Sequence, residues 1–234
     1  MQMTAALNFF GKVLKPTARG LFWAFLNKTN FVLRTGNRRF EFERLYLKNR
    51  DPWGYLTNAY EREKYQRTLS CLLNCSHKSG QVLEVGCSIG VFTKMLVSNF
   101  TEVTAVEISK EALSAAIDLN RGVSNVRFVF GDLLSVKLGA VYDVIICAEI
   151  LYYIPQRDTD LACRQLALHL ADKGVIVVVM GVSDFVSDNR NDPSYSNGWE
   201  SILGAHFRCV FAENVLDARR PYRIGVYSLA TGKS

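Results

Sequence analysis

The chain has 234 residues, of which 49% are hydrophobic and 21% are charged, and its formal net charge is +6. This length suits one α/β domain, or one domain with an added segment, and the apolar fraction excludes a disordered or low-complexity chain. Residues 1–50 carry ten basic and two acidic side chains, a net charge of +8, whereas residues 51–234 carry −2. Proteins that bind nucleic acid usually gather Lys and Arg along one binding surface. The imbalance therefore argues against nucleic acid as a partner.

Residues 1–50 are predicted to form a basic extension that precedes one domain over 51–234. Residues 4–27 are predicted to be helical in two pieces, the second starting at Pro16, with apolar side chains on one side and Lys12, Lys15 and Arg19 roughly opposite. Such a helix can pack on its own domain, on a partner, or on an anionic lipid surface, so peripheral membrane contact through residues 1–30 stays open.

Three further features of the composition bear on location and metal content. The longest apolar run near the N-terminus, Gly20–Leu26, is far shorter than the roughly 20 residues of a membrane span. The six cysteines lack the dense spacing of a disulfide framework, and the three histidines form no ligand cluster with them. We therefore expect reduced cysteines, a cytoplasmic location and no metal.

The chain after residue 50 alternates helical and strand-like segments. Residues 30–49 resemble a connector, and a first helix is predicted over 57–73. The predicted strands are 81–85, 103–107, 126–130, 142–147, 175–180, 207–212 and 223–229, and helices are predicted over 90–99, 110–119, 160–170 and near 199–203. Because helices separate most strands, we expect a doubly wound α/β fold with a mostly parallel seven-stranded sheet. The last two strands can pair antiparallel, and the run VIVVVM predicts a strand that is buried on both faces.

A glycine-containing loop, VLEVGCSIG, follows the first strand and precedes a helix. Gly86 and Gly90 allow close backbone approach to a ligand, and a helix N-terminus offers unpaired N–H groups. The loop is neither a P-loop nor a complete dinucleotide fingerprint, because no Gly-Lys-Ser/Thr follows and Ser88 stands at the middle glycine position. Glycine counting alone equally allows an ordinary turn between strand and helix.

Two acidic residues at the ends of later strands strengthen the ligand hypothesis. Glu107 ends the second strand, where a carboxylate can accept hydrogen bonds from both ribose hydroxyls, and Asp132 follows the third strand, within reach of an adenine amino group. Each acid alone could be a solvated strand end or a helix cap. Together they indicate a nucleoside site at the carboxyl edge of the sheet.

From about Gln81 to Leu229 the chain resembles the class I S-adenosylmethionine (SAM)-dependent methyltransferases. The resemblance implies that the loop holds the methionine part of SAM, that Glu84 lies beneath it, that Glu107 binds the ribose, and that Asp132 lies near the adenine. The predicted cofactor-binding residues are Glu84, Gly86, Cys87, Ser88, Gly90, Glu107, Ile108, Asp132, Leu133, Trp53 and Tyr60.

A narrower resemblance rests on the segment DPWGYLTNAYEREKYQRTL at Asp51–Leu69, on GCSIG, and on ILYYI at Ile150–Ile154. These segments are similar to the nodulation protein S (NodS)-like branch, which N-methylates a deacetylated amino sugar of a chitin-type oligosaccharide. The resemblance implies a saccharide or other small polar acceptor.

Methyl transfer requires a nucleophile in line with the methyl carbon and exclusion of water. Glu149 follows the fourth strand, where it could serve as base or orienting acceptor, or simply begin a helix. Tyr152 is the second catalytic candidate. Trp53 and Tyr60 could form an aromatic lid, or merely pack the N-terminal helix.

The sequence thus predicts a metal-free SAM-dependent methyltransferase that acts on an amine of a deacetylated oligosaccharide. Two alternatives remain. One is O- or N-methylation of another small metabolite, and the other is a non-catalytic peripheral membrane or scaffold protein that keeps the same fold.

Overall fold

The computed structural model describes residues 38–75, 80–182 and 198–230. A compact unit begins at Phe42 and contains every strand found in those residues. The helix predicted over residues 4–27 and the membrane contact predicted for residues 1–30 lie outside the described residues. The proposed boundary near residue 50 therefore stays a prediction.

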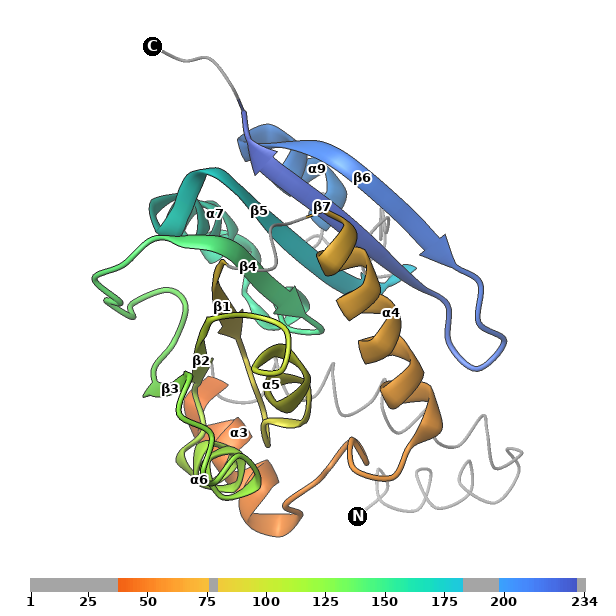
Figure 1. The fold of residues 1–234 in the computed structure, drawn as a ribbon. Helices are drawn as coiled ribbons and strands as arrows, with labels where there is room; N and C mark the ends of the chain where they lie inside the picture. Colours follow the sequence, from red (N-terminus) through yellow and green to blue (C-terminus); the bar gives the residue numbers. More distant parts are fainter. Residues whose placement is uncertain (1–37, 76–79, 183–197, 231–234) are drawn as a thin grey trace, which may run out of the picture. The chain divides into compact units, whose positions relative to one another are not determined.

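Helices and strands alternate through most of the described chain (Figure 1). The helices are α3 (Arg38–Lys48), α4 (Ala59–Cys75), α5 (Val91–Leu96), α6 (Lys110–Leu119), α7 (Thr159–His169) and α9 (Trp199–His206), with short 3-10 turns at η1 (Leu151–Tyr153) and η2 (Gln156–Asp158). The strands are β1 (Gln81–Val85), β2 (Glu102–Glu107), β3 (Val126–Phe130), β4 (Tyr142–Ala148), β5 (Leu170–Gly181), β6 (Phe207–Val215) and β7 (Tyr222–Leu229).

The strands of the described residues form one seven-stranded sheet in the order β3-β2-β1-β4-β5-β7-β6. The first five are parallel, and β7 pairs antiparallel with both β5 and β6. The chain moves outward from β1 to β3 and then returns to place β4 on the other side of β1. The carboxyl ends of β1 and β4 therefore flank the topological switch point, where open α/β sheets bind ligands.

Alternating side chains of the central strands divide the core into two layers. Leu83, Ile145 and Ile176 face α7 and α9, in a cluster that also contains Leu166 and Trp199. Their neighbours Val82, Val144 and Val177 face the other layer, in which α4 and α5 contribute Leu72, Phe92 and Leu96. A parallel strand covered on both faces needs apolar side chains in both directions. The prediction for the VIVVVM run is confirmed, since Ile176 to Met180 are all buried.

The predicted doubly wound sheet and the antiparallel final pair are confirmed, but the connector predicted over residues 30–49 is wrong for residues 38–48, which form α3. Phe42 and Tyr46 lie one helical turn apart, and Tyr46 is buried against Ile89 and Ala112. The helix exists because of this packing, which the basic composition of the segment concealed. The strands β5 and β6 also extend further than predicted, because their ends pair with β4 and β7.

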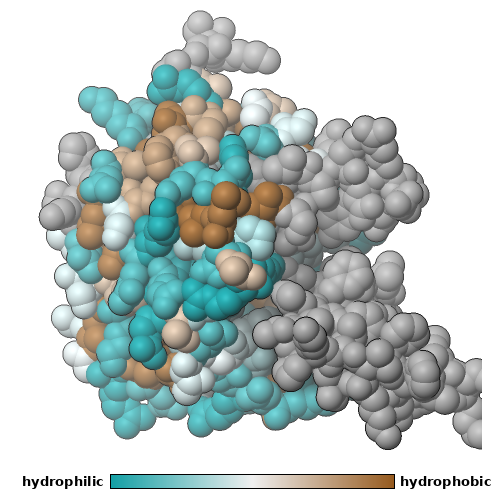
Figure 2. Space-filling view, turned by 90° about the vertical axis from the view of Figure 1, so that its right-hand side faces the viewer, coloured by the Kyte–Doolittle hydropathy of each residue, from teal (hydrophilic) through white to brown (hydrophobic). Residues whose placement is uncertain are grey.

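Hydrophilic side chains predominate on much of the coloured surface in Figure 2, with apolar patches between them. Among the described residues, the edge strand β6 exposes Val210 and Phe211, and a register shift between Cys209 and Phe211 interrupts its pairing with β7. Nowhere in the described part of the chain is a helix long and apolar enough to cross a membrane.

Candidate functional site

The loop after β1 has an unusual backbone. Gly86 and Gly90 have φ values of 76° and 78°, and Ser88 between them has a φ of 52°. A Cβ atom on Gly86 would lie 2.5 Å from Cγ2 of Ile150, and one on Gly90 would lie 2.9 Å from Cβ of Ala116. The two glycines are therefore required both by backbone conformation and by close packing. Every second residue of the loop adopts the left-handed conformation, which keeps the turn tight at the switch point.

Ser88 takes this conformation despite its side chain, which costs about 1–2 kcal/mol. Its hydroxyl lies 2.5 Å from Oη of Tyr46 on α3, and both side chains are buried. Burial and the nearby Glu107 raise the pKa of Tyr46 well above its ordinary value, so the phenol stays neutral and can donate or accept in this contact. The hydrogen bond gives the serine a role that glycine could not fill, because it ties the loop to α3.

Glu107, at the end of β2, holds the loop from the opposite side. Its carboxylate accepts backbone N–H bonds from Ser88, Ile108 and Ser109 at 2.8, 2.8 and 2.9 Å. Burial raises the pKa of this carboxyl, while the three amide bonds oppose that shift, and the net direction is upward. A carboxylate has about four lone-pair positions. Three are used here, so a diol bound at Glu107 would have to share or displace one of these amides.

Three other loop amides also donate hydrogen bonds. The N–H groups of Gly86 and Cys87 both donate to the carbonyl of Val106, at 2.8 and 3.0 Å, and the N–H of Gly90 donates to Cys87. The Cys87 side chain packs with Ala105, Leu113 and Ala116, and its thiol lies 3.8 Å from the carbonyl oxygen of Ser88. Cys87 therefore shapes the loop through its backbone and supports α6 through its side chain.

Glu43 on α3 completes the contacts of this region. Its carboxylate accepts hydrogen bonds from Oγ of Ser109 at 2.8 Å and from the N–H of Lys110 at 2.7 Å, at the start of α6. A carboxylate is favourable at a helix N-terminus, where it meets unpaired N–H groups and the positive end of the dipole. Glu43 and Tyr46 thus anchor α3 to both turns that surround Glu107.

Glu84 in β1 lies beneath the loop. It is almost completely buried, and it accepts a hydrogen bond from Oγ1 of Thr93 at 2.5 Å. Burial raises the pKa of Glu84 from its ordinary value near 4.5 to about 8, against the opposing effect of Thr93. Removal from water disfavours the charged form, so the carboxyl is largely protonated at neutral pH in the ligand-free protein.

We expect Glu84→Gln to stabilise the ligand-free protein progressively as the pH rises from about 5 to 9. The folded state holds a proton on Glu84 that the unfolded chain releases near pH 4.5, so wild-type stability falls between that pH and the folded pKa of about 8. Glutamine cannot titrate, and the difference in unfolding free energy approaches a value on the order of 5 kcal/mol above pH 8.

Denaturant unfolding of both proteins at several pH values measures this difference. Glu111→Gln, an exposed substitution in the first turn of α6, is the matched control and should leave the pH dependence unchanged. A constant difference between Glu84→Gln and the wild type across the pH range contradicts the assignment.

The residues predicted to lie near the adenine occupy the ends of β2 and β3. Asp132 follows β3, and its carboxylate accepts the N–H of Leu134 at 3.0 Å, which stabilises the turn. Leu133 is buried in the core cluster that contains Leu138 and Val85. Ile108 is half-buried and donates its N–H to Glu107. The turn thus brings Asp132 and Ile108 to the same edge of the sheet as the glycine loop.

The predicted aromatic lid separates into two groups. Trp53 lies within ring-contact distance of Phe42, Tyr46 and Tyr55, near the loop residue Ile89. Tyr60 is buried elsewhere: it donates its hydroxyl to the carbonyl of Arg220 at 2.8 Å and makes an edge contact with Tyr222. The structure therefore places Trp53 beside the loop and Tyr60 against the β6–β7 hairpin, and contact of either with a cofactor stays a prediction.

Glu149, the first catalytic candidate, directly follows β4 and also has a left-handed backbone, with a φ of 58°. Its buried carboxylate accepts a hydrogen bond from Nζ of Lys64 at 3.0 Å and lies 3.5 Å from Nη2 of Arg220. Strained non-glycine residues cluster at functional sites. Glu149 precedes Ile150, the residue that closes over Gly86, so the candidate acid and the glycine loop share the switch point.

Tyr152, the second candidate, is buried in the core, and its ring centroid lies 4.4 Å from that of Tyr153. Burial and the Glu149 carboxylate raise the pKa of Tyr152 well above its ordinary value. The phenol is therefore neutral at physiological pH and can donate a hydrogen bond, but it is a poor base.

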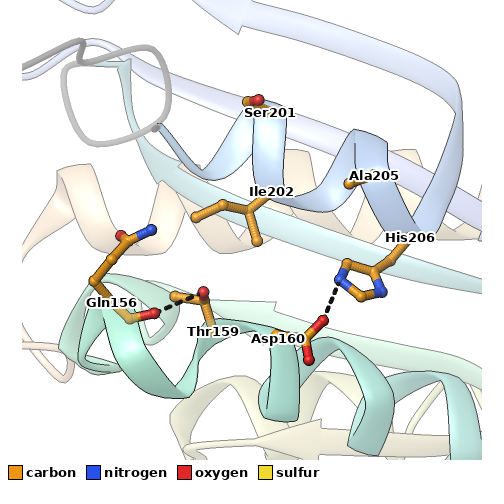
Figure 3. A pocket seen from close by; sticks show the side chains of 7 residues that line it. All are labelled: Gln156, Thr159, Asp160, Ser201, Ile202, Ala205 and His206. Atoms are coloured by element: carbon orange, nitrogen blue, oxygen red, sulfur yellow. Dashed lines mark hydrogen bonds and ion pairs between the residues drawn. The ribbon is translucent and has the colours of Figure 1, made fainter. Parts of the chain in front are cut away.

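A surface hollow of about 250 Å³ lies elsewhere, between η2, α7 and α9 (Figure 3). It is lined by Gln156, Thr159, Asp160, Ser201, Ile202, Ala205 and His206. His206 Nε2 lies 3.0 Å from Oδ1 of Asp160 across the hollow. None of the predicted site residues lines it.

The described residues fit a cationic, nucleoside-containing ligand such as SAM. The loop has left-handed residues and no side chain on two of them, and buried carboxyl groups lie at the ends of three adjacent strands. In these parts of the chain, no group of three or more His, Cys, Asp or Glu side chains could hold a metal ion. All six cysteines are free.

The sheet order, with an antiparallel seventh strand between the fifth and sixth, defines the class I methyltransferase fold. The structure superposes on that of N-methyltransferase NodS from Bradyrhizobium japonicum WM9, solved with S-adenosyl-l-homocysteine, with a TM-score of 0.70. That match has 22% sequence identity and covers 82% of this chain and 99% of the other.

The sequence profile of the Nodulation protein S (NodS) family matches residues 37–186. Nodulation protein S of Azorhizobium caulinodans is 33% identical over 179 residues, which cover 74% of this chain and 80% of that protein. A ubiquinone biosynthesis O-methyltransferase of Paraburkholderia xenovorans is 32% identical over 138 residues, which cover 56% and 53% of the two chains. This chain belongs to the NodS family and is a SAM-dependent methyltransferase.

Three residues of this region did not emerge from the sequence. The sequence predicts a connector at Glu43 and Tyr46, although the spacing of Phe42 and Tyr46 by one helical turn is a usable signal. The sequence predicts a helix at Lys64 but no role for its side chain. Its partner Glu149 lies 85 residues away, and no local pattern indicates that contact.

Proposed function

We propose that this chain transfers a methyl group from SAM to an amino group of a deacetylated chitin-type oligosaccharide. Membership of the NodS family supports nitrogen as the methylated atom, because the NodS structure that matches is named an N-methyltransferase. The choice of an oligosaccharide rests on the resemblance of Asp51–Leu69 to the NodS-like branch. When bound, SAM supplies the carbon electrophile: the nitrogen–carbon bond forms as the sulfonium–carbon bond breaks, and S-adenosyl-l-homocysteine remains.

We propose that the glycine loop and Glu107 hold the cofactor, with Asp132 and Ile108 near its adenine. The loop fixes a tight backbone beside Ile150, and Glu107 offers a buried acceptor for ribose hydroxyls. Glu84 lies beneath the loop. Trp53 packs beside the loop residue Ile89, on the side of α3. In this arrangement the chain binds and orients the donor, and excludes water from it.

The observation that carries the choice of an amine is the pairing of Glu149 with two cations. A carboxylate in contact with Lys64 and Arg220 is stabilised in its ionised form and is a weak base. A sugar hydroxyl would need a strong base before it could attack, whereas a neutral amine already carries its lone pair. Glu149 can therefore accept a hydrogen bond from the amine and stabilise the positive charge that develops on nitrogen.

We expect methyl transfer from SAM to deacetylated chitooligosaccharides, and a rate at least about 100-fold lower with the fully acetylated compounds. Acetylation converts the nitrogen into an amide, whose lone pair is delocalised, and it adds bulk at the reacting atom. A radiolabelled-methyl assay on oligosaccharides of equal length measures both rates. Equal rates, or no transfer to either compound, contradict the proposal.

O-methylation of a small molecule is the second candidate, favoured by the similarity to a ubiquinone biosynthesis O-methyltransferase. The weak basicity of Glu149 argues against it for an alcohol. We also propose the cytoplasm as the site of action, since all six cysteines are free. Transfer without a metal ion remains a prediction.

A further inference from the structure

Four charged side chains meet around Glu149, at the carboxyl end of β4. Nζ of Lys64 on α4 lies 2.8 Å from Oε2 of Glu61 and 3.0 Å from Oε1 of Glu149, and Arg220 approaches the other oxygen of Glu149 at 3.5 Å. Lys64 and Glu149 are almost inaccessible to solvent. Burial alone lowers the pKa of Lys64, but its interactions with Glu149 and Glu61 outweigh that effect and raise it, so the ammonium persists.

Packing alone does not require this arrangement. A buried charge network costs desolvation free energy, and apolar residues of similar volume often replace such networks without loss of stability. The network also converges on Glu149, whose backbone is held in the left-handed conformation. A costly ion pair and a strained backbone meet at Glu149. Together they indicate that the residue is kept for function rather than for the stability of the fold.

The other groups around Glu149 do not compete for this role. Tyr55, Tyr60 and Tyr152 interact electrostatically with its carboxylate, and burial raises the pKa of each phenol above its ordinary value. These phenols remain neutral at physiological pH. Among the described residues that face Glu149, the cations are Lys64 and Arg220, and each contacts a different oxygen of its carboxylate.

We propose that Lys64, assisted by Arg220, is a positioning residue that keeps Glu149 ionised and directs one of its oxygens for the acceptor amine. Lys64 does not touch the acceptor in this scheme and transfers no proton. Its ammonium holds Oε1 of Glu149 in place. Glu61, one turn earlier on α4, supplies a second anionic partner that stabilises the buried ammonium. This inference rests on the proposed amine methylation, and it explains the EREK segment of α4 as part of the reaction site.

The pH profile of kcat/KM with a deacetylated chitooligosaccharide tests the inference. In the wild type, only the acceptor amine must lose a proton, so log kcat/KM rises with a slope of about 1 in the acidic range. In Lys64→Met, Glu149 loses its principal cation and must also deprotonate, so the slope increases toward about 2. At pH 7 we expect kcat/KM of this variant to fall at least about tenfold.

Four further variants test whether the change in slope comes from the Lys64–Glu149 pair. Lys64→Arg retains the cation and should restore the slope to about 1. Lys64→Met combined with Glu149→Gln removes the titrating group and should return the slope to about 1 at a low rate. Arg220→Gln, at a partly exposed site, should cause a smaller effect of the same sign in a folded protein. Lys173→Met, at an exposed position, is the matched control and should match the wild type.

Calorimetric binding of S-adenosyl-l-homocysteine to each variant shows that the cofactor site is intact. A slope of about 1 in both Lys64→Met and Arg220→Gln overturns the inference while the proposed function stands. If Lys64→Met does not fold, the Arg220→Gln profile alone decides. A wild type that methylates no deacetylated oligosaccharide overturns the proposed function and, with it, this inference.

Discussion

Replacement of Glu107 by alanine is expected to lower the affinity for SAM at least about 100-fold. Hydrogen bonds to a charged group contribute about 1.5–3 kcal/mol each, and about 1.4 kcal/mol corresponds to a tenfold change in affinity. The loss of two ribose contacts would thus be sufficient. The substitution also releases the N–H of Ser88, which Glu107 holds at 2.8 Å, and so loosens the loop.

Isothermal titration calorimetry with SAM and with S-adenosyl-l-homocysteine measures this loss. Glu102→Ala is the matched control, because Glu102 begins the same strand and its side chain is exposed at the opposite edge of the sheet. Glu107→Gln should fall between the wild type and the alanine variant, since one oxygen acceptor remains. An unchanged dissociation constant in Glu107→Ala excludes Glu107 as a cofactor ligand.

The second large effect is expected for Glu149→Gln, which should lower kcat about 100-fold with little change in cofactor affinity. The amide retains the shape of the side chain but lacks the negative charge that would stabilise a developing ammonium. Lys64 keeps Glu61 as a partner at 2.8 Å, so the variant is expected to fold.

Single-turnover methyl transfer and calorimetry separate the two readouts for Glu149→Gln. Asp143→Asn is the matched control: Asp143 lies on the same strand at its beginning, where it accepts the N–H of Gln81. If Glu149→Gln weakens cofactor affinity and leaves kcat unchanged, Glu149 binds the cofactor and does not assist the acceptor, which contradicts the proposed role.

Local patterns were sufficient for most of the fold. The β-branched runs and the helical periodicity between them predicted the strands of the parallel sheet within a few residues, because each element buries its own apolar face. The prediction failed at α3, where a basic and aromatic segment becomes helical through contacts with Ile89 and Ala112. Those contacts are distant in sequence, and the local sign of the helix, the spacing of Phe42 and Tyr46 by one helical turn, is weak within a basic segment.

The candidate site divides in the same way. The positions of Gly86, Gly90 and Glu107 followed from their places at the ends of consecutive strands, since the carboxyl ends of parallel strands meet at one edge. The tie from Ser88 to Tyr46 and the position of Tyr60 against the β6–β7 hairpin did not follow, because both depend on how α3 and α4 dock on the sheet.

The sequence by itself therefore determined the class of fold and the placement of the glycine loop and Glu107 at one edge of the sheet, because these depend on short-range spacing and on the rule that parallel strands end together. Only the tertiary structure decided which partners the Glu149 carboxylate has. A carboxylate at a strand end could have been a free base, a helix cap or half of an ion pair. Lys64, 85 residues earlier, makes it the last of these through a contact of 3.0 Å. Electrostatics at a buried site depends on distances in space, which separation along the chain does not reveal.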